Sequence, residues 1–197
     1  MEDRQATLEK LREIDATYYH EAGHAVIGEL FGFRPLRIEG PLCVHDRRTS
    51  AFFRQDFLFR SPKTRERASQ YAIGLAAGIA AESKGTGEPF NSLRETSGEG
   101  DYEKLECLLE RLMLSDCRSD SPEARQNQMQ LWEAKAKALL ERPEVWAAVE
   151  SVVSYLYDGL GELDADDIAA AIREGRNAVV YANPDVEFDS LKSGDEL

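Results

Sequence analysis

The chain has few cysteines, and this scarcity excludes two classes of protein. Cys43, Cys107 and Cys117 are the only three cysteines in 197 residues, and no two of them form a C-x-x-C pair. An odd and scattered set favours neither a disulfide framework nor a thiolate zinc cluster. We therefore expect buried, inert thiols in a reducing compartment, the cytoplasm.

Long apolar segments and excess positive charge are also missing. The most apolar run, YAIGLAAGIAA from Tyr71, has about half of the roughly 20 residues that a bilayer-spanning helix needs. The first residues, MEDRQATLEKLRE, have the charge pattern of a helix and not that of a signal peptide. Lys and Arg number 24 against 37 Asp and Glu, a net charge of -13, so no basic stripe for nucleic acid is visible. We expect neither a membrane nor a nucleic acid as partner.

Helical periodicity and capping signals dominate the rest of the sequence and predict a mainly α fold. Helix starts are indicated by Ser61-Pro62, Ser121-Pro122, Pro143 and Asp164. The expected helices cover residues 8–31, 61–83, 101–114, 121–141, 143–160 and 164–172. Residues 84–100 are expected to form a loop, and the alternating or aromatic stretch 36–56 predicts short strands and hence a small β element.

A chain of 197 residues fits one domain, which we predict to span residues 1–183. The acidic residues 184–197 contain too little apolar surface to fold alone, so we predict a flexible tail there.

Two helical stripes of similar residues indicate how the predicted helices pack. Small residues, Gly74, Ala77, Gly78 and Ala81, permit close helix approach, and a large apolar stripe, Trp132, Leu139, Val145, Val149, Val152, Val153 and Leu156, indicates core packing.

The chemistry of the chain centres on YYHEAGHAVIGELFG, which contains two of its three histidines. On a helix, His20 and His24 project from one face, where two imidazole nitrogens can hold one cation. Glu21 lies beside that position and can take a proton from a water that the metal activates. H-E-x-x-H on a helix is typical of zinc metallopeptidases. The same pattern also fits a helix whose two histidines are satisfied by hydrogen bonds, but small or apolar neighbours such as Ala22 and Gly23 predict a buried face, where two unliganded histidines are costly.

A third protein ligand must come from elsewhere, because two imidazoles, one carboxylate and a water would fill a catalytic zinc site. The compact H-E-x-x-H-x-x-G-x-x-H site is excluded, since Ile27 and Leu30 occupy the positions of its glycine and its third histidine. Spacing alone leaves five carboxylates open: Glu82, Glu95, Glu99, Asp101 and Glu103. His45, in the expected loop region, is either a surface histidine or a group that stabilises an oxyanion.

Three blocks of the sequence, in order, resemble the zinc metallopeptidase domain of FtsH-type proteases. They are YYHEAGHAVIGELFG, AAGIAAES at residues 76–83 and TSGEGDYEKLECLL at residues 96–109, with a weaker likeness around LDADDIAAAI. The resemblance implies that His20, His24 and Asp101 bind zinc and that Glu21 is the catalytic base. Glu82 is then either a partner that orients a ligand histidine or a solvated acid.

The chain also departs from that family. It contains no G-x-x-x-x-G-K-[ST] phosphate loop, so we expect a stand-alone peptidase domain without an ATPase module or membrane anchor. Tyr102 and Ile79 replace residues typical of the family, which affects expected assembly and substrate handling more than zinc binding.

The predicted function is that of a zinc-dependent metalloendopeptidase, which hydrolyses peptide bonds of unfolded or flexible protein substrates without ATP. The alternative is a zinc-containing, non-proteolytic module that binds a peptide or protein. A homo-oligomer and a partner ATPase acting in trans both remain open.

Overall fold

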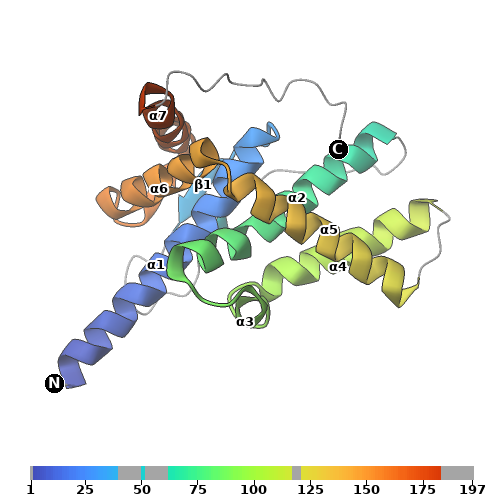
Figure 1. Ribbon diagram of the computed structural model, residues 1–197, viewed down its shortest axis with the longest axis horizontal. Helices are drawn as coiled ribbons and strands as arrows, with labels where there is room; N and C mark the ends of the chain where they lie inside the picture. Colours follow the sequence, from blue (N-terminus) through green and yellow to red (C-terminus); the bar gives the residue numbers. More distant parts are fainter. Residues whose placement is uncertain (1, 40–49, 52–61, 117–120, 183–197) are drawn as a thin grey trace.

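The computed structural model describes residues 2–39, 50–51, 62–116 and 121–182, and there the chain is mainly helical with a small antiparallel sheet (Figure 1). This confirms the predicted fold class. The elements follow one another as α1 (Glu2–Leu30), β1 (Arg37–Glu39), β2 (Ser50–Ala51), α2 (Pro62–Thr86), α3 (Phe90–Arg94), α4 (Glu99–Asp116), α5 (Pro122–Leu140), α6 (Pro143–Asp158), β3 (Glu162–Asp164) and α7 (Ala165–Ala182).

The predicted helix starts correspond to real ones. Helices α2, α5 and α6 each begin at a proline, where the missing N–H costs no hydrogen bond. Ser121 Oγ accepts a hydrogen bond from the backbone N–H of Ala124 at 3.1 Å, and Asp164 Oδ1 accepts from those of Asp166 and Asp167 at 2.9 and 3.0 Å. These are the first-turn donors that a helix leaves unpaired.

Four local predictions need correction. Residues 84–100 are not one loop, because α2 continues to Thr86, α3 occupies Phe90–Arg94 and α4 begins at Glu99. The strand β3 has no predicted counterpart, and α7 runs ten residues beyond the predicted end at Ile172. Cys107 is exposed on α4 and not buried, because it lies on the outer face of that helix. The other two cysteines, His45 and the predicted tail from 184 lie outside the described residues.

The helices pack around α1 and α2, which form the most extensive pair. Helix α5 covers α2, α6 packs on α1, and α7 packs on α6 (Figure 1). The predicted large apolar stripe lies in this core, where Trp132, Val149 and Leu156 are at most 1% exposed. The small-residue stripe meets Gly23 of α1. An added Cβ there would lie 2.5 Å from the Ala77 carbonyl oxygen and 2.6 Å from Ala81 Cβ, so the two helix backbones approach closely.

The sheet has the order β2-β1-β3, with both pairs antiparallel. Ile38 of β1 pairs with Ala51 and with Leu163, and Ile38 and Leu163 are buried in the core. The two segments of the predicted β element at 37–39 and 50–51 are therefore strands, completed by a third strand from far along the chain.

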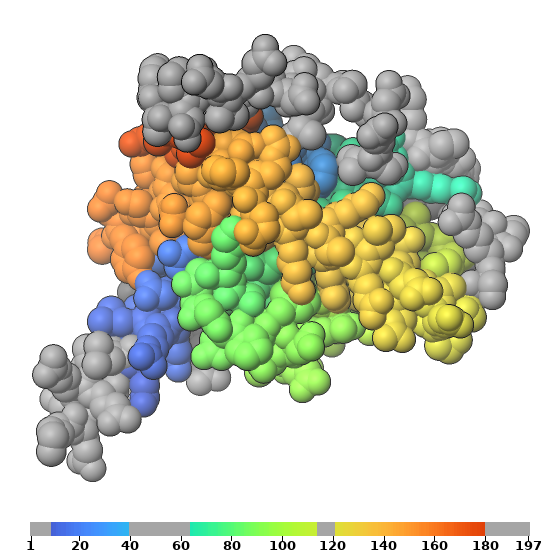
Figure 2. Space-filling view, in the orientation of Figure 1, coloured from blue at the N-terminus to red at the C-terminus, as the bar shows by residue number. Residues whose placement is uncertain are grey.

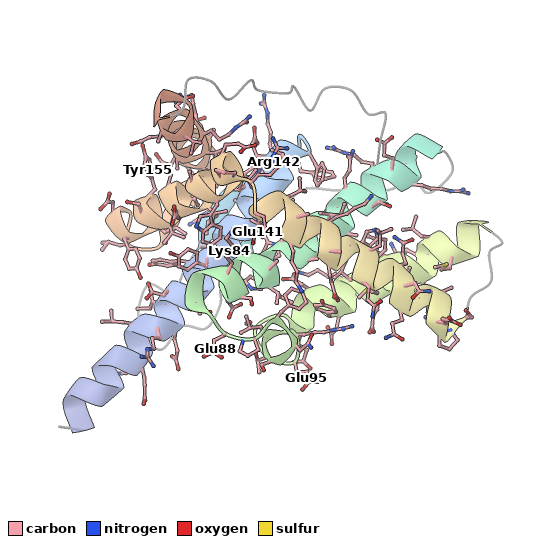
Figure 3. All side chains as sticks on the ribbon, in the orientation of Figure 1. Lys84, Glu88, Glu95, Glu141, Arg142 and Tyr155 are labelled. Carbon is pink, nitrogen blue, oxygen red and sulfur yellow. The ribbon has the colours of Figure 1, made fainter. Side chains whose placement is uncertain are left out.

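A side chain near the end of α2 joins that helix to α5 and α6. Lys84 of α2 points toward Glu141 at the end of α5 (Figure 3); its Nζ lies 3.2 Å from Glu141 Oε1 and donates to the Leu140 carbonyl oxygen at 2.7 Å. Lys84 also lies over the ring of Trp146, which stacks on Tyr19 of α1. On the N-terminal side of Tyr19, α1 extends away from the body of the molecule (Figure 2), and residues 9–13 are exposed. None of the described helices is long and apolar enough to cross a membrane.

Candidate metal centre

Two helices bring three potential ligands together inside the core. His20 and His24 lie one turn apart on α1, with their ring centroids 4.7 Å apart, and Asp101 lies in the first turn of α4. Asp101 Oδ2 is 3.0 Å from His20 Nε2 and 2.9 Å from His24 Nε2. The three residues are at most 7% exposed, and one ligand atom from each lies within 4.8 Å of the other two.

Helix α2 forms the wall behind the two rings, and its sequence makes room for them. A Cβ added to Gly78 would lie 2.5 Å from His24 Cε1 and Nε2 and 2.8 Å from His20 Nε2. Those distances are below any normal contact, so the predicted small-residue face serves the site as well as the packing of α1 on α2.

Each ring is held through its other nitrogen. His24 Nδ1 lies 2.8 Å from the Gly74 carbonyl oxygen, and His20 Nδ1 lies 2.9 Å from Glu82 Oε2. Glu82 Oε2 also accepts a hydrogen bond from Ser97 Oγ at 2.7 Å. Glu82 is buried and lies where it can orient the His20 ring, the first of the two roles predicted for it, and such partners fix the ring orientation of metal-binding histidines.

These hydrogen bonds determine where the ring protons lie. A carbonyl oxygen can only accept, so His24 Nδ1 donates to Gly74; Glu82 Oε2, which accepts from Ser97, likewise accepts from His20 Nδ1. In a neutral imidazole the opposite nitrogen then carries a lone pair. Two such lone pairs and a carboxylate oxygen point at one another, and this arrangement requires positive charge between them, from extra protons or from a metal ion.

The ionisation of the site agrees with this need for positive charge. Burial lowers the pKa of His20, but hydrogen bonds to Asp101 and Glu82 outweigh burial and raise it to about 10. For Asp101, burial raises the pKa, whereas the charge of His24 and the hydrogen bonds from both histidines lower it more, to well below its usual range. A divalent cation would supply the same charge without protonating either ring.

Glu21 is the fourth residue of the predicted site. It lies on α1 between the histidines and is 4% exposed, and no hydrogen-bond partner of its buried Oε2 is found among the described residues. A buried carboxylate oxygen without a partner is costly, so it is uncommon in folded proteins unless a solvent molecule or ligand meets it. The charge of Glu21 raises the pKa of His20, so the carboxylate lies near that ring, and a molecule bound next to Oε2 could transfer a proton to it.

Burial separates the five carboxylates that spacing left open. Glu95, Glu99 and Glu103 are exposed, and Figure 3 places Glu95 at the outer end of α3. Glu82 and Asp101 are buried, but Glu82 faces the Nδ1 side of His20, away from the point where the two Nε2 atoms converge. Asp101 alone of the five joins the two histidines.

The sequence did not indicate three further contributors: the Gly74 carbonyl, Ser97 and Lys104. Lys104 Nζ lies 2.9 Å from Asp101 Oδ1. Its spacing of three residues from Asp101 on a helix was a usable signal. The contacts of Gly74 and Ser97 depend on how α1, α2 and the segment before α4 meet.

The donor set fits zinc. Two imidazole nitrogens and one carboxylate oxygen are common ligands of catalytic zinc, with bonds of about 2.0 to 2.2 Å, which in a tetrahedral site separates the ligand atoms by roughly 3.3 Å. The separations of Asp101 Oδ2 from the two Nε2 atoms, 3.0 and 2.9 Å, are close to this value, and all three ligand atoms lie within 4.8 Å of one another.

Comparison with known proteins adds no assignment: the chain matches no protein-family model and no curated protein.

Proposed function

We propose that this protein is a zinc-dependent metallopeptidase of the FtsH-peptidase type, which cuts peptide bonds in unfolded or flexible protein segments. One observation carries the proposal. His20, His24 and Asp101 converge on one point inside the core, and within the described part of the chain the buried Oε2 of the neighbouring residue Glu21 has no hydrogen-bond partner, so it can receive a proton from a reacting molecule.

In this proposal His20 Nε2, His24 Nε2 and Asp101 Oδ2 hold the zinc ion. When bound, the ion supplies Lewis-acid activation, which lowers the pKa of water from about 15.7 towards 7 and polarises the peptide carbonyl. Glu82 and the Gly74 carbonyl keep both Nε2 atoms directed at the site. Glu21 Oε2 accepts the proton of the attacking water and returns it to the amine that leaves.

The decisive experiment combines metal analysis with a cleavage assay. We expect one zinc ion per chain and cleavage of a fluorescently labelled, unfolded casein substrate. Glu21→Gln preserves the shape of the side chain but cannot accept the proton, so it should retain zinc and lose cleavage by roughly 10²- to 10⁴-fold. Glu13→Gln, an exposed position on the same helix, is the matched control and should cleave like the wild type.

Each contrary result has its own meaning. Wild-type cleavage by Glu21→Gln would remove Glu21 from the mechanism. Stoichiometric zinc without cleavage of any unfolded substrate would contradict the peptidase and support a zinc-containing binding module. Absence of bound metal after purification and zinc addition would contradict both.

A reducing compartment, the cytoplasm, is part of the proposal, and the exposed, unpaired thiol of Cys107 supports it. Thiol titration of protein purified without reductant should then find all three cysteines free. Fewer free thiols would argue for an oxidising compartment.

A further inference from the structure

The two oxygens of the Asp101 carboxylate face different partners. Oδ2 is the atom that both histidine Nε2 atoms approach, at 3.0 and 2.9 Å. Oδ1 lies 2.9 Å from the ammonium nitrogen of Lys104. The carboxylate is therefore divided between the metal-binding point and a positively charged side chain.

Lys104 is placed to hold this contact at low cost. It follows Asp101 by three residues on α4, so the helix itself brings the two side chains together. Its side chain is 61% exposed whereas that of Asp101 is 9% exposed, so the lysine reaches a buried carboxylate from the solvent side. Among the described residues, Lys104 is the only lysine or arginine that forms an ion pair with Asp101.

This division matters because a carboxylate can bind a metal ion through one oxygen or through both. Binding through both oxygens would occupy a position that a catalytic zinc site keeps for water and substrate. A charge-assisted hydrogen bond to one oxygen is stronger than a neutral one, and a metal ion would have to compete with it for that oxygen.

We propose that Lys104 is a positioning residue that keeps Asp101 a one-oxygen ligand and so leaves a coordination position for water and substrate. The inference rests on the metal centre of the proposed function. It predicts that loss of the ammonium group lets Oδ1 join Oδ2 on the ion and increases the coordination number.

Cobalt substitution tests this directly, because four-coordinate Co²⁺ absorbs visible light several-fold more strongly than five-coordinate Co²⁺. Wild-type protein loaded with one equivalent of Co²⁺ should give the intense four-coordinate spectrum. Lys104→Met, which keeps the length of the side chain and removes the charge, should bind Co²⁺ with a several-fold weaker spectrum. Lys104→Arg keeps the charge and should restore the wild-type intensity.

Arg111→Met is the matched control, because it removes a positive charge from an exposed position farther along the same helix. It should leave the cobalt spectrum unchanged. Circular dichroism of each apoprotein identifies any variant that has not folded, and Lys104→Gln then replaces Lys104→Met.

The outcomes separate this inference from the proposed function. If the wild type and Lys104→Met give the same four-coordinate spectrum, the positioning role of Lys104 is wrong while the metal centre stands. If Arg111→Met weakens the spectrum as much as Lys104→Met, the effect is one of general charge and the inference is equally wrong. A wild-type protein that takes up no Co²⁺ overturns the metal centre and this inference together.

Discussion

Among single residues of the site, Gly78 is tightly constrained, because the two imidazole rings occupy the space that a side chain would need. In Gly78→Ala the new methyl group would lie 2.5 Å from His24 Nε2 and 2.8 Å from His20 Nε2, so both rings must turn away. We expect zinc affinity to fall by roughly 10- to 100-fold, the loss typical of disturbed ligand orientation. Competition against a chromophoric chelator measures it.

Gly74→Ala is the control for this substitution. Position 74 lies one turn earlier on α2, and a Cβ there meets no heavy atom within 4 Å. The backbone carbonyl that accepts from His24 is unchanged, and the alanine should favour the helix by about 0.5 to 1 kcal/mol. Gly74→Ala should therefore keep wild-type zinc affinity. Equal affinities for the two variants would mean that the rings have more freedom than the structure gives them.

Individual site residues differ in how far the sequence could predict them. His20, Glu21 and His24 follow from local helix geometry, because residues one turn apart share a face in any α-helix. Asp101 needed the family resemblance, since five carboxylates fitted equally by spacing, and only burial together with the side of the histidine that each acid faces distinguishes them. Ser97 was not predicted, because its role depends on a partner, Glu82, that the tertiary fold brings to it. Lys104 was not predicted although its spacing of three residues from Asp101 is a local signal, because that signal indicates a role only once Asp101 is placed at the site.

Helices α1 and α6 are joined by a hydrogen bond whose strength depends on pH. Tyr157 of α6 donates to Asp15 of α1 and meets Tyr18 edge-on, with the ring centroids 4.9 Å apart. Burial raises the pKa of Tyr157, and the hydrogen bond to Asp15 raises it further. The folded state thus favours the neutral phenol, so the stabilisation is complete below about pH 10, the usual tyrosine pKa, and is lost as the pH rises towards the folded-state value.

Asp15→Asn should therefore lower the pH at which Tyr157 ionises, because the negative charge that opposes tyrosinate is gone. Difference ultraviolet absorbance between the variant and the wild type, followed from pH 8 upward, measures this shift. Tyr157→Phe should show a shallower fall of melting temperature above about pH 10. Asp158→Asn removes a nearby exposed charge of α6 and should leave both measurements unchanged. Coincident titrations of Asp15→Asn and the wild type would contradict the link.

At the scale of helices and strands, the sequence predicted which segments are helical far better than it predicted where the helices end. It did not predict the strand β3. Ser121 with Pro122, and Asp164, mark helix starts because their caps form within one turn. The strand β3 has only three residues, and it exists because Leu163 pairs with Ile38, which lies far earlier in the chain. Such pairing leaves little local signal. The short helix α3 is hidden for a related reason: its single buried residue, Leu93, gives no periodicity to detect.

The whole molecule is organised so that the candidate metal centre joins separate parts of the chain. The proposed ligands come from α1 and α4, and α2 supplies both the wall and Glu82. Zinc that binds this arrangement and not the unfolded chain must stabilise the fold. At a free concentration of 100 times Kd the gain is about 2.7 kcal/mol, which for a chain of this size raises Tm by roughly 5 to 11 °C.

Thermal unfolding with zinc and with excess chelator measures this difference, and a ligand variant separates the site from nonspecific binding. His24→Ala removes one of the converging nitrogens, so its melting temperature should respond little to zinc even if its starting stability is lower. The comparison is made within each protein, which removes the intrinsic cost of the substitution. Because exposed carboxylates bind cations weakly throughout a chain of net charge -13, a zinc response that persists in His24→Ala would place the stabilisation on the surface. A response confined to the wild type would place it where α1, α2 and α4 meet.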